Sequence, residues 1–191
     1  MEKALKEYLR EDESILWQSQ PVAFPLMENG FKFRILRNWL ITIALLGALL
    51  VTYCSRNDEW SMGFVGAVVI LGAMIIISPL WERRAIMKQK YFITDQRAIL
   101  MMKDKSLFSM ELSAIDDYRL VSDMASQDCL VLGSSLFEDI RKQMRWRTCH
   151  PNNDRQSTNN QDRVDGVIFY GISNAQAAIE LLSVNSSKIA A

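Results

Sequence analysis

The sequence predicts a two-helix transmembrane hairpin followed by a mainly-β domain, in which a bent antiparallel sheet or partly open barrel is capped by a C-terminal helix. Two uncharged apolar runs in the first half of the chain, at 38–55 and 60–81, predict the hairpin. After residue 90, short segments rich in β-branched and aromatic residues alternate with polar turns, which predicts strands. A last segment with apolar residues at helical spacing predicts the closing helix.

The longer apolar run, Trp60–Trp81, would be about 33 Å long as a helix, close to the hydrocarbon thickness of a bilayer. A tryptophan at each end suits the membrane–water interface. The alternative is a buried helix of a soluble protein, which would need a larger domain around it than the remaining residues supply. We therefore expect this run to span a membrane.

The shorter run, Asn38–Ser55, would be about 27 Å long as a helix and can also span. Only residues 56–59 separate the two runs, which predicts antiparallel helices joined by a tight connection. Small residues four apart permit close helix contact in lipid, and they predict a helix–helix interface at Ala44, Ala48, Gly63 and Ala67. The alternative is that glycine and alanine are simply common in membrane helices.

Flanking cations predict the orientation of the hairpin. Only Arg56 lies in the connection, whereas seven cations flank the two outer ends: Lys32, Arg34, Arg37, Arg83, Arg84, Lys88 and Lys90. The positive-inside rule therefore places both termini in the cytoplasm. A polar stretch of more than 30 residues precedes the first run, so we expect an internal anchor rather than a secretory signal.

Beyond the hairpin, the 191-residue chain divides into a cytoplasmic N-terminal segment, 1–37, and a β domain with its closing helix, 86–185. Only the second is long enough to bury a core. The formal net charge is zero, which gives no general attraction to nucleic acid. The three cysteines show no CxxC spacing, so neither a disulfide framework nor a metal site is expected.

The β domain is expected to consist of short strands with polar turns between them. We expect strands at Tyr91–Thr94, Ala98–Met102, Ser106–Ile115, Tyr118–Val121, Cys129–Leu132 and Val164–Ile172. Residues 136–148 fit a helix or a strand, and a strand is favoured; residues 152–161 are expected to form a solvated loop. Ser173 or Asn174 would cap the last helix, whose inward residues are Ala177, Ala178, Leu181 and Leu182.

Two features are expected before the first span. Leu5, Tyr8 and Leu9 have the spacing of a short amphipathic helix. The apolar cluster Ile15–Trp17, closed by Pro21, is expected to pack on the β domain or on the membrane surface.

Four stretches give the chain a resemblance to a known family: Leu9–Pro21, Tyr91–Met101, Met110–Leu120 and Phe169–Leu182. In that order they resemble an acidic and apolar lead, an aromatic-Ile-Thr signature that ends in arginine, a strand that ends in acidic residues, and a closing strand and helix. The family is that of bacterial pleckstrin-homology-like (PH-like) domains, in proteins where a transmembrane hairpin precedes the domain. The resemblance implies a PH-like fold and an integral protein of the bacterial cytoplasmic (inner) membrane.

Residues with catalytic potential are few. His150 and Cys149 are adjacent in sequence, and neither has an orienting partner that the sequence identifies. Asp116 and Asp117 follow a strand, where such a pair usually forms a turn. We therefore expect no catalytic site, no cofactor and no metal, although an enzyme acting through Cys149 or His150 stays a third option.

A basic cluster around one tryptophan is the best candidate for a binding surface: Arg141, Lys142, Arg145, Trp146 and Arg147. It is expected to contact anionic headgroups weakly; the alternative is a solvated strand face with Trp146 in the core. The predicted function is a membrane-anchored, non-enzymatic interaction module. Its partners would be the lipid bilayer and at least one protein, with no nucleic acid, and a homo-oligomer stays open. The alternative is a small accessory subunit that acts through its hairpin.

Overall fold

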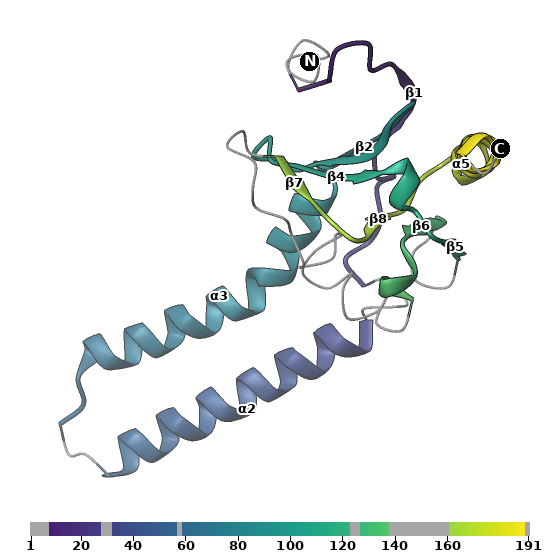
Figure 1. The fold of residues 1–191 in the computed structure, drawn as a ribbon. Coiled ribbons are helices and arrows are strands. Elements are labelled where there is room, and N and C mark those ends of the chain that lie inside the picture. The colour runs from purple at the N-terminus through teal and green to yellow at the C-terminus, as the bar shows by residue number, and fades with distance from the viewer. Residues whose placement is uncertain (1–7, 28–31, 57–58, 123–126, 138–160, 190–191) are drawn as a thin grey trace. The chain divides into compact units, whose positions relative to one another are not determined.

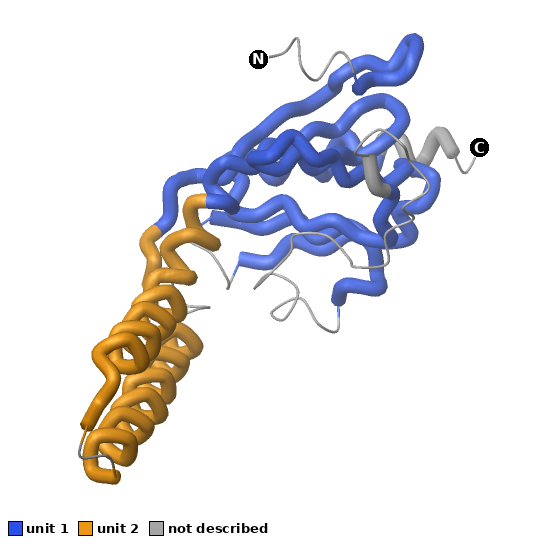
Figure 2. The backbone as a smooth tube through the Cα atoms, turned by 90° about the vertical axis from the view of Figure 1, so that its left-hand side faces the viewer, with its two compact units in different colours: residues 1–24, 85–191 blue, residues 25–84 orange. Residues whose placement is uncertain are grey.

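In a computed structural model, residues 8–27, 32–56, 59–122, 127–137 and 161–189 are described (Figure 1). The chain divides into two compact units, which Figure 2 distinguishes by colour. One unit comprises residues 1–24 together with 85–191, and the other comprises residues 25–84. The coarse layout that the sequence predicts is confirmed: two long apolar helices, then two sheets and a C-terminal helix.

The second unit consists mainly of two long helices, α2 (Lys32–Arg56) and α3 (Met62–Ile86). Both are long and apolar enough to cross a membrane. Each helix extends past the predicted span on the charged side, because lysine, arginine and glutamate favour helix as well as leucine does. Ser61 immediately precedes α3 and caps it: its hydroxyl accepts a hydrogen bond from the Phe64 N–H at 3.4 Å.

The closest approach between the two helices is at a position other than the four small residues that the sequence indicates. Ala44, Ala48, Gly63 and Ala67 are all exposed. The close approach is instead at Gly72, which is buried: a Cβ atom placed there would lie 2.7 Å from the Leu46 Cδ1. Small residues permit close contact at many positions along a helix, and the face that the partner's large side chains occupy decides which positions are used.

A proline interrupts the backbone hydrogen bonding near the end of α3. Pro79 lies inside the helix and has no N–H to donate to the carbonyl of Ile75. One residue further on, the carbonyl of Ile76 accepts a hydrogen bond from the Trp39 Nε1 at 3.1 Å. Trp39 thus links α2 to the turn of α3 in which Pro79 removes a backbone hydrogen bond.

The first sheet of the β domain has five strands in the order β1-β2-β3-β4-β7. Its strands are β1 (Ile15–Ser19), β2 (Lys90–Thr94), β3 (Arg97–Met101), β4 (Leu107–Glu111) and β7 (Gln161–Arg163). Neighbours are antiparallel except for β7, which is parallel to β4. The predicted strand 106–115 is shorter in the structure, because the chain turns at Leu112 into the 3₁₀ helix η1 (Leu112–Ala114).

The second sheet has three antiparallel strands in the order β5-β6-β8. Its strands are β5 (Tyr118–Val121), β6 (Cys129–Leu132) and β8 (Val167–Phe169), and the 3₁₀ helix η2 (Ser134–Leu136) follows β6. The predicted bounds of β5 and β6 are correct. The predicted strand 164–172 contains β8 but is too long, since a bend at Asp165–Gly166 and the positive φ of Gly171 limit it.

The last helix, α5 (Ala175–Ile189), begins as predicted. The Asn174 Oδ1 accepts a hydrogen bond from the Ala177 N–H at 3.4 Å, so Asn174 is the capping residue. Ala178 and Leu182 are buried, whereas Ala177 and Leu181 are only partly buried. Buried aliphatic and aromatic side chains from both sheets form the core beside this helix, and the largest include Tyr91, Ile99, Leu130, Ile168 and Phe169.

The segment before the hairpin is part of the β domain. Of the two expectations for the Ile15–Trp17 cluster, packing on the β domain is confirmed: β1 pairs with β2, and Trp17 stacks on Phe169 with ring centroids 5.9 Å apart. Further along, the Val22 N–H donates to the Gly171 carbonyl at 2.9 Å. Most of the predicted amphipathic helix at 2–10 lies outside the described residues.

The hairpin is inserted between two neighbouring strands. The chain leaves β1 at Ser19 and enters β2 at Lys90, and Ser19 lies directly opposite Tyr91 in the sheet. Both ends of the inserted segment are therefore attached to adjacent strands of one sheet.

Candidate functional site

The predicted basic cluster, Arg141, Lys142, Arg145, Trp146 and Arg147, lies outside the described residues, as do Cys149 and His150. The preferred strand at 136–148 lies there too, apart from its first two residues. Of these, Leu136 ends η2 and Phe137 has αR backbone angles, so the segment does not start as a strand. The lipid-contact hypothesis for this cluster stays a prediction.

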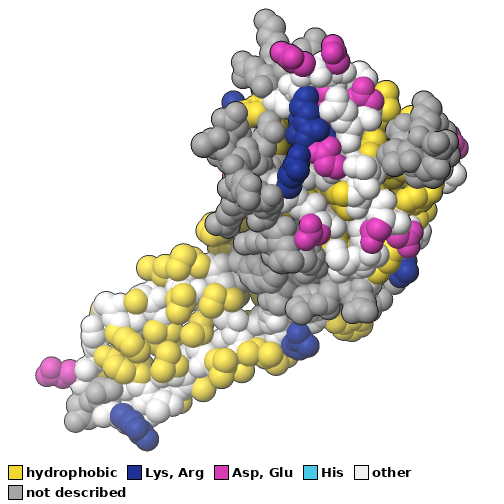
Figure 3. Space-filling view, in the orientation of Figure 1, with side chains coloured by type: hydrophobic (Ala, Val, Ile, Leu, Met, Phe, Trp, Pro, Cys, Tyr) yellow, Lys and Arg dark blue, Asp and Glu magenta, His cyan; other side chains and the backbone are white. Residues whose placement is uncertain are grey.

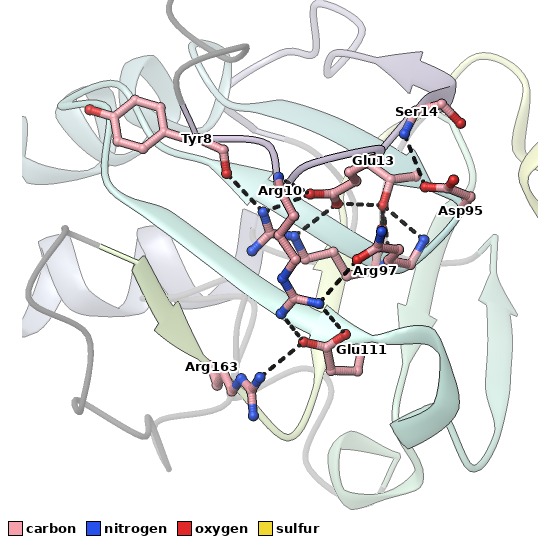
Figure 4. A network of polar contacts seen from close by, with 10 residues as sticks. Tyr8, Arg10, Glu13, Ser14, Asp95, Arg97, Glu111 and Arg163 are labelled. Carbon is pink, nitrogen blue, oxygen red and sulfur yellow. Dashed lines mark hydrogen bonds and ion pairs between the residues drawn. The ribbon is translucent and has the colours of Figure 1, made fainter.

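The most buried of the ion pairs between described residues joins Glu13 and Arg97 (Figure 4). The guanidinium donates through Nε to the Glu13 Oε1 and through Nη2 to the Glu13 Oε2, each at 2.9 Å. The side chain of Glu13 is 0% exposed and that of Arg97 is 4% exposed. Two parallel hydrogen bonds fix both planar groups, which is the strongest geometry for a carboxylate and a guanidinium.

Glu13 is held in place by a turn of the segment before β1. The Glu13 N–H donates to the Arg10 carbonyl at 3.1 Å, and the Arg10 N–H donates to the Glu13 Oε2 at 2.9 Å. Asp12, between them, has a φ of 64°, a left-handed conformation that aspartate tolerates better than most residues. The Arg97 Nη2 also donates to the Tyr8 carbonyl at 2.9 Å, which draws the chain before the turn to the same point.

Arg97 is positioned by the turn between β2 and β3. The Thr94 hydroxyl accepts hydrogen bonds from the backbone N–H groups of Gln96 and Arg97, at 3.2 and 2.9 Å. The same hydroxyl donates to the Glu13 Oε1 at 2.7 Å. One threonine thus closes the turn and contributes to the acceptor site of the ion pair.

Opposing effects set the proton affinity of Glu13. Burial acts to raise its pKa, but hydrogen bonds from Arg97, the Arg10 backbone and Thr94, together with the charge of Arg97, outweigh it. The pKa of Glu13 therefore lies below its ordinary value of 4.5. At neutral pH Glu13 is therefore ionised, and its charge lies against the Arg97 guanidinium inside the domain.

A more exposed layer of contacts surrounds the ion pair. Arg10 contacts the carboxylate of Glu111 at the end of β4, with Nη1 donating to the Oε2 at 3.1 Å. Arg163 of β7 reaches the same carboxylate at 3.3 Å. The Arg10 Nη1 also donates to the Gln96 Oε1 at 3.3 Å. These contacts connect the N-terminal segment to the turn between β2 and β3 and to the end of β4.

Sequence reasoning identifies the two partners of this pair only separately. Glu13 and Arg97 occur in two of the stretches that carry the family resemblance, but they are 84 residues apart with two apolar runs between them. Arg97 is only 3% exposed and is bound to Glu13, so its guanidinium is not presented to a ligand at the surface. The signal that could have indicated the pair is the occurrence of a buried-strand arginine with an acidic residue ahead of another strand.

Cys129 and Asp116, which sequence alone could suggest as reactive groups, make contacts that stabilise the fold. Cys129 is 0% exposed, and its sulfur accepts a hydrogen bond from the Gly171 N–H at 3.4 Å. Asp116 holds Ser134 through the Ser134 N–H at 2.9 Å and through its hydroxyl. Among the residues that the structure describes, no group of three or more histidine, cysteine, aspartate or glutamate side chains is arranged to hold a metal ion.

No family model matches the chain, and neither a curated protein nor a solved structure matches it.

Proposed function

We propose that this protein is a membrane-anchored, non-enzymatic interaction module, in which a two-span hairpin holds a PH-like domain at the cytoplasmic face of a bacterial inner membrane. The domain would bind a protein partner and make weak contact with anionic lipid. The hairpin supplies the anchor, and the sheets supply the rigid scaffold.

The exposure of the apolar helices is the observation that carries the proposal. In the most apolar window of each helix, only 6% of α2 and 11% of α3 residues are buried. Large side chains such as Leu40 and Val51, each 70% exposed, cover the hairpin surface, as Figure 3 shows in yellow. A soluble protein rarely exposes so large an apolar surface, and a buried core helix would be covered. Lipid is the environment that these surfaces match.

The layout of the domain supports the PH-like assignment. Four antiparallel strands, β1 to β4, are followed by three more, β5, β6 and β8, and then by α5. Two sheets followed by a C-terminal helix are consistent with the PH-like layout that the resemblance implies. The additional short strand β7 extends the first sheet at its β4 edge.

The chain path supports the placement of both termini on one side. Because β1 and β2 are hydrogen-bonded neighbours, the two ends of the hairpin return to one domain. That agrees with the cation asymmetry, which directs the same two ends to the cytoplasm.

The accessory-subunit alternative has one observation in its favour. An apolar groove of about 300 Å³ runs along the hairpin, lined by residues that include Thr42, Gly47, Val69 and Ala73. A Cβ atom placed at Gly47 would have no neighbouring atom within 4 Å, so the backbone there is accessible. A third helix from a larger complex would fit such a surface.

A hairpin exchange tests the proposal against this alternative. Residues 32–86 are replaced by an unrelated two-span hairpin, and proteins that co-purify in mild detergent are compared with those of the wild type. Retained partners are expected, because the proposed binding surface lies on the domain. Loss of every partner, with the exchanged protein still in the membrane and its domain folded, would instead favour the accessory subunit.

A further inference from the structure

The hairpin is inserted within the β domain, so the domain is built from chain segments on both sides of the insertion. Among the strands that the structure describes, β1 comes before the hairpin and the others come after it. β1 supplies the backbone partners of β2 and the ring that stacks on Phe169. The residues just before β1 supply Glu13, whose carboxylate pairs with the buried guanidinium of Arg97.

Loss of the N-terminal part would leave a specific defect. Arg97 would lose the carboxylate that accepts hydrogen bonds from its Nε and Nη2, and loss of one partner of a buried ion pair is strongly destabilising. The β2 edge would lose its ladder, and Tyr8, Leu9 and Ile15 would no longer cover the apolar cluster of Phe92, Ile99 and Leu107. Domain folding therefore requires residues 8–24 and the residues after the hairpin in one compartment.

We infer that completion of the β domain by β1 acts as a check on membrane topology: the domain folds only when the inserted segment crosses the bilayer an even number of times. This inference rests on the proposed membrane anchor. A chain with one failed span would leave β1 and β2 on opposite sides. The charged residues of the N-terminal segment oppose its later transfer across the bilayer.

Cys129 provides a natural reporter of domain folding. Its side chain is 0% exposed in β6, so a membrane-permeant maleimide reaches it only when the domain opens. In a C54S/C149S background, Cys129 is the only thiol of the chain. Its labelling rate in native membranes then measures opening of the domain.

The number of spans can be varied while every other native residue is kept. One leucine-rich span of about 20 residues is inserted at Asn57, in the connection, to give three crossings, and two such spans give four. A polar insert of the same length as one span is the matched control. We expect Cys129 to be protected in the wild type, the polar control and the four-span chain, and to be labelled rapidly in the three-span chain.

A second variant tests the ion pair in the unmodified topology. E13Q should raise the labelling rate of Cys129 by about a hundredfold or more, the factor that the loss of a buried ion-pair partner implies. E11Q, at an exposed position two residues away, should leave it unchanged.

The outcomes separate this inference from the proposed anchor. Rapid labelling of the three-span chain alone supports the inference. Protection of Cys129 in a three-span chain that resists alkaline carbonate extraction would overturn it and leave the anchor intact. Release of the wild-type chain by carbonate would contradict the anchor, and the inference with it.

Discussion

At the scale of single residues, the Glu13–Arg97 pair is the contact with the largest expected effect on stability. Both groups are buried, and each accepts or donates further hydrogen bonds. Removal of one partner takes the opposite charge away from a buried ion, whereas removal of both leaves no buried charge and only a packing defect.

E13Q should lower the free energy of unfolding of the domain by about 3–5 kcal/mol, the usual cost of breaking a buried pair from one side. Thermal or urea unfolding followed by tryptophan fluorescence measures it. The double variant E13L/R97M should be less destabilised than E13Q alone, because no charge remains buried. An E13Q protein as stable as the wild type would show that the pair contributes little.

The pH dependence follows from the direction of the Glu13 pKa. The folded-state value lies below 4.5, so the ionised pair stabilises the folded state above the unfolded-state pKa. This contribution is lost as the pH falls through the lower, folded-state value. The stability difference between wild type and E13Q should therefore be constant from neutral pH down to about 5 and shrink in more acidic buffer. A difference that grows on acidification would contradict the assignment.

At the scale of elements, the packing of the hairpin depends on one glycine. Gly72 is buried against Leu46, whereas Gly47 has open space beside it. The two positions therefore form a matched pair for substitution.

G72V should separate the two helices, and G47V should not. Spin labels at Leu45 and Ile70, both exposed, report the distance between the helices. We expect a longer or broader distance distribution in G72V and an unchanged one in G47V. Equal responses would show that the helices pack through another face, such as the one that carries Ala44, Ala48, Gly63 and Ala67.

The predictable elements are those that local pattern determines. β5 and β6 are short apolar segments bounded by polar residues, and their bounds follow directly from the sequence. β7, with the sequence Gln-Asp-Arg, carries no strand pattern and forms only because β4 offers a free edge. The packing of Ile15–Trp17 on the domain could be expected from the sequence, but its pairing as β1 could not, because its partner β2 lies on the other side of the hairpin.

Candidate site residues were harder to obtain from the sequence than strands. A single-sign cluster such as 141–147 is visible in sequence because its members are adjacent, but adjacency says nothing about what they contact. The Glu13–Arg97 pair depends on contact between residues 84 apart, which no local pattern contains. Small residues in the helices do not identify the interface either, because glycine and alanine occur at both buried and lipid-exposed positions of membrane helices.

At the scale of the whole molecule, the insertion of the hairpin changes how the domain should be isolated. A fragment that starts at residue 86 lacks β1 and Glu13, so it should fail to fold. Residues 8–24 joined to 88–191 through a flexible linker keep both. Protease resistance of the two fragments measures the difference, and a resistant fragment 86–191 would contradict the role assigned to β1.

The joined domain also tests the lipid hypothesis for the basic cluster. Each arginine near an anionic surface contributes about 1 kcal/mol, so Arg141, Arg145 and Arg147 would give weak, salt-sensitive binding. Sedimentation with vesicles that contain phosphatidylglycerol measures it. The triple variant R141Q/R145Q/R147Q should lose this binding and keep its unfolding temperature. Equal sedimentation of both proteins at low salt would exclude these arginines as the lipid contact.

The most direct test of the central claim is the side of the membrane that each part of the chain occupies. Single cysteines are placed at Asn57 in the connection and at the exposed Lys103 of the domain, in a chain whose native cysteines are replaced. An impermeant maleimide is then applied to intact cells and to lysed cells. We expect N57C to react in intact cells and K103C only after lysis, with β1 and β2 on the inner side. Reaction of K103C in intact cells, or of neither cysteine before lysis, would contradict a hairpin that spans the membrane and holds the domain in the cytoplasm.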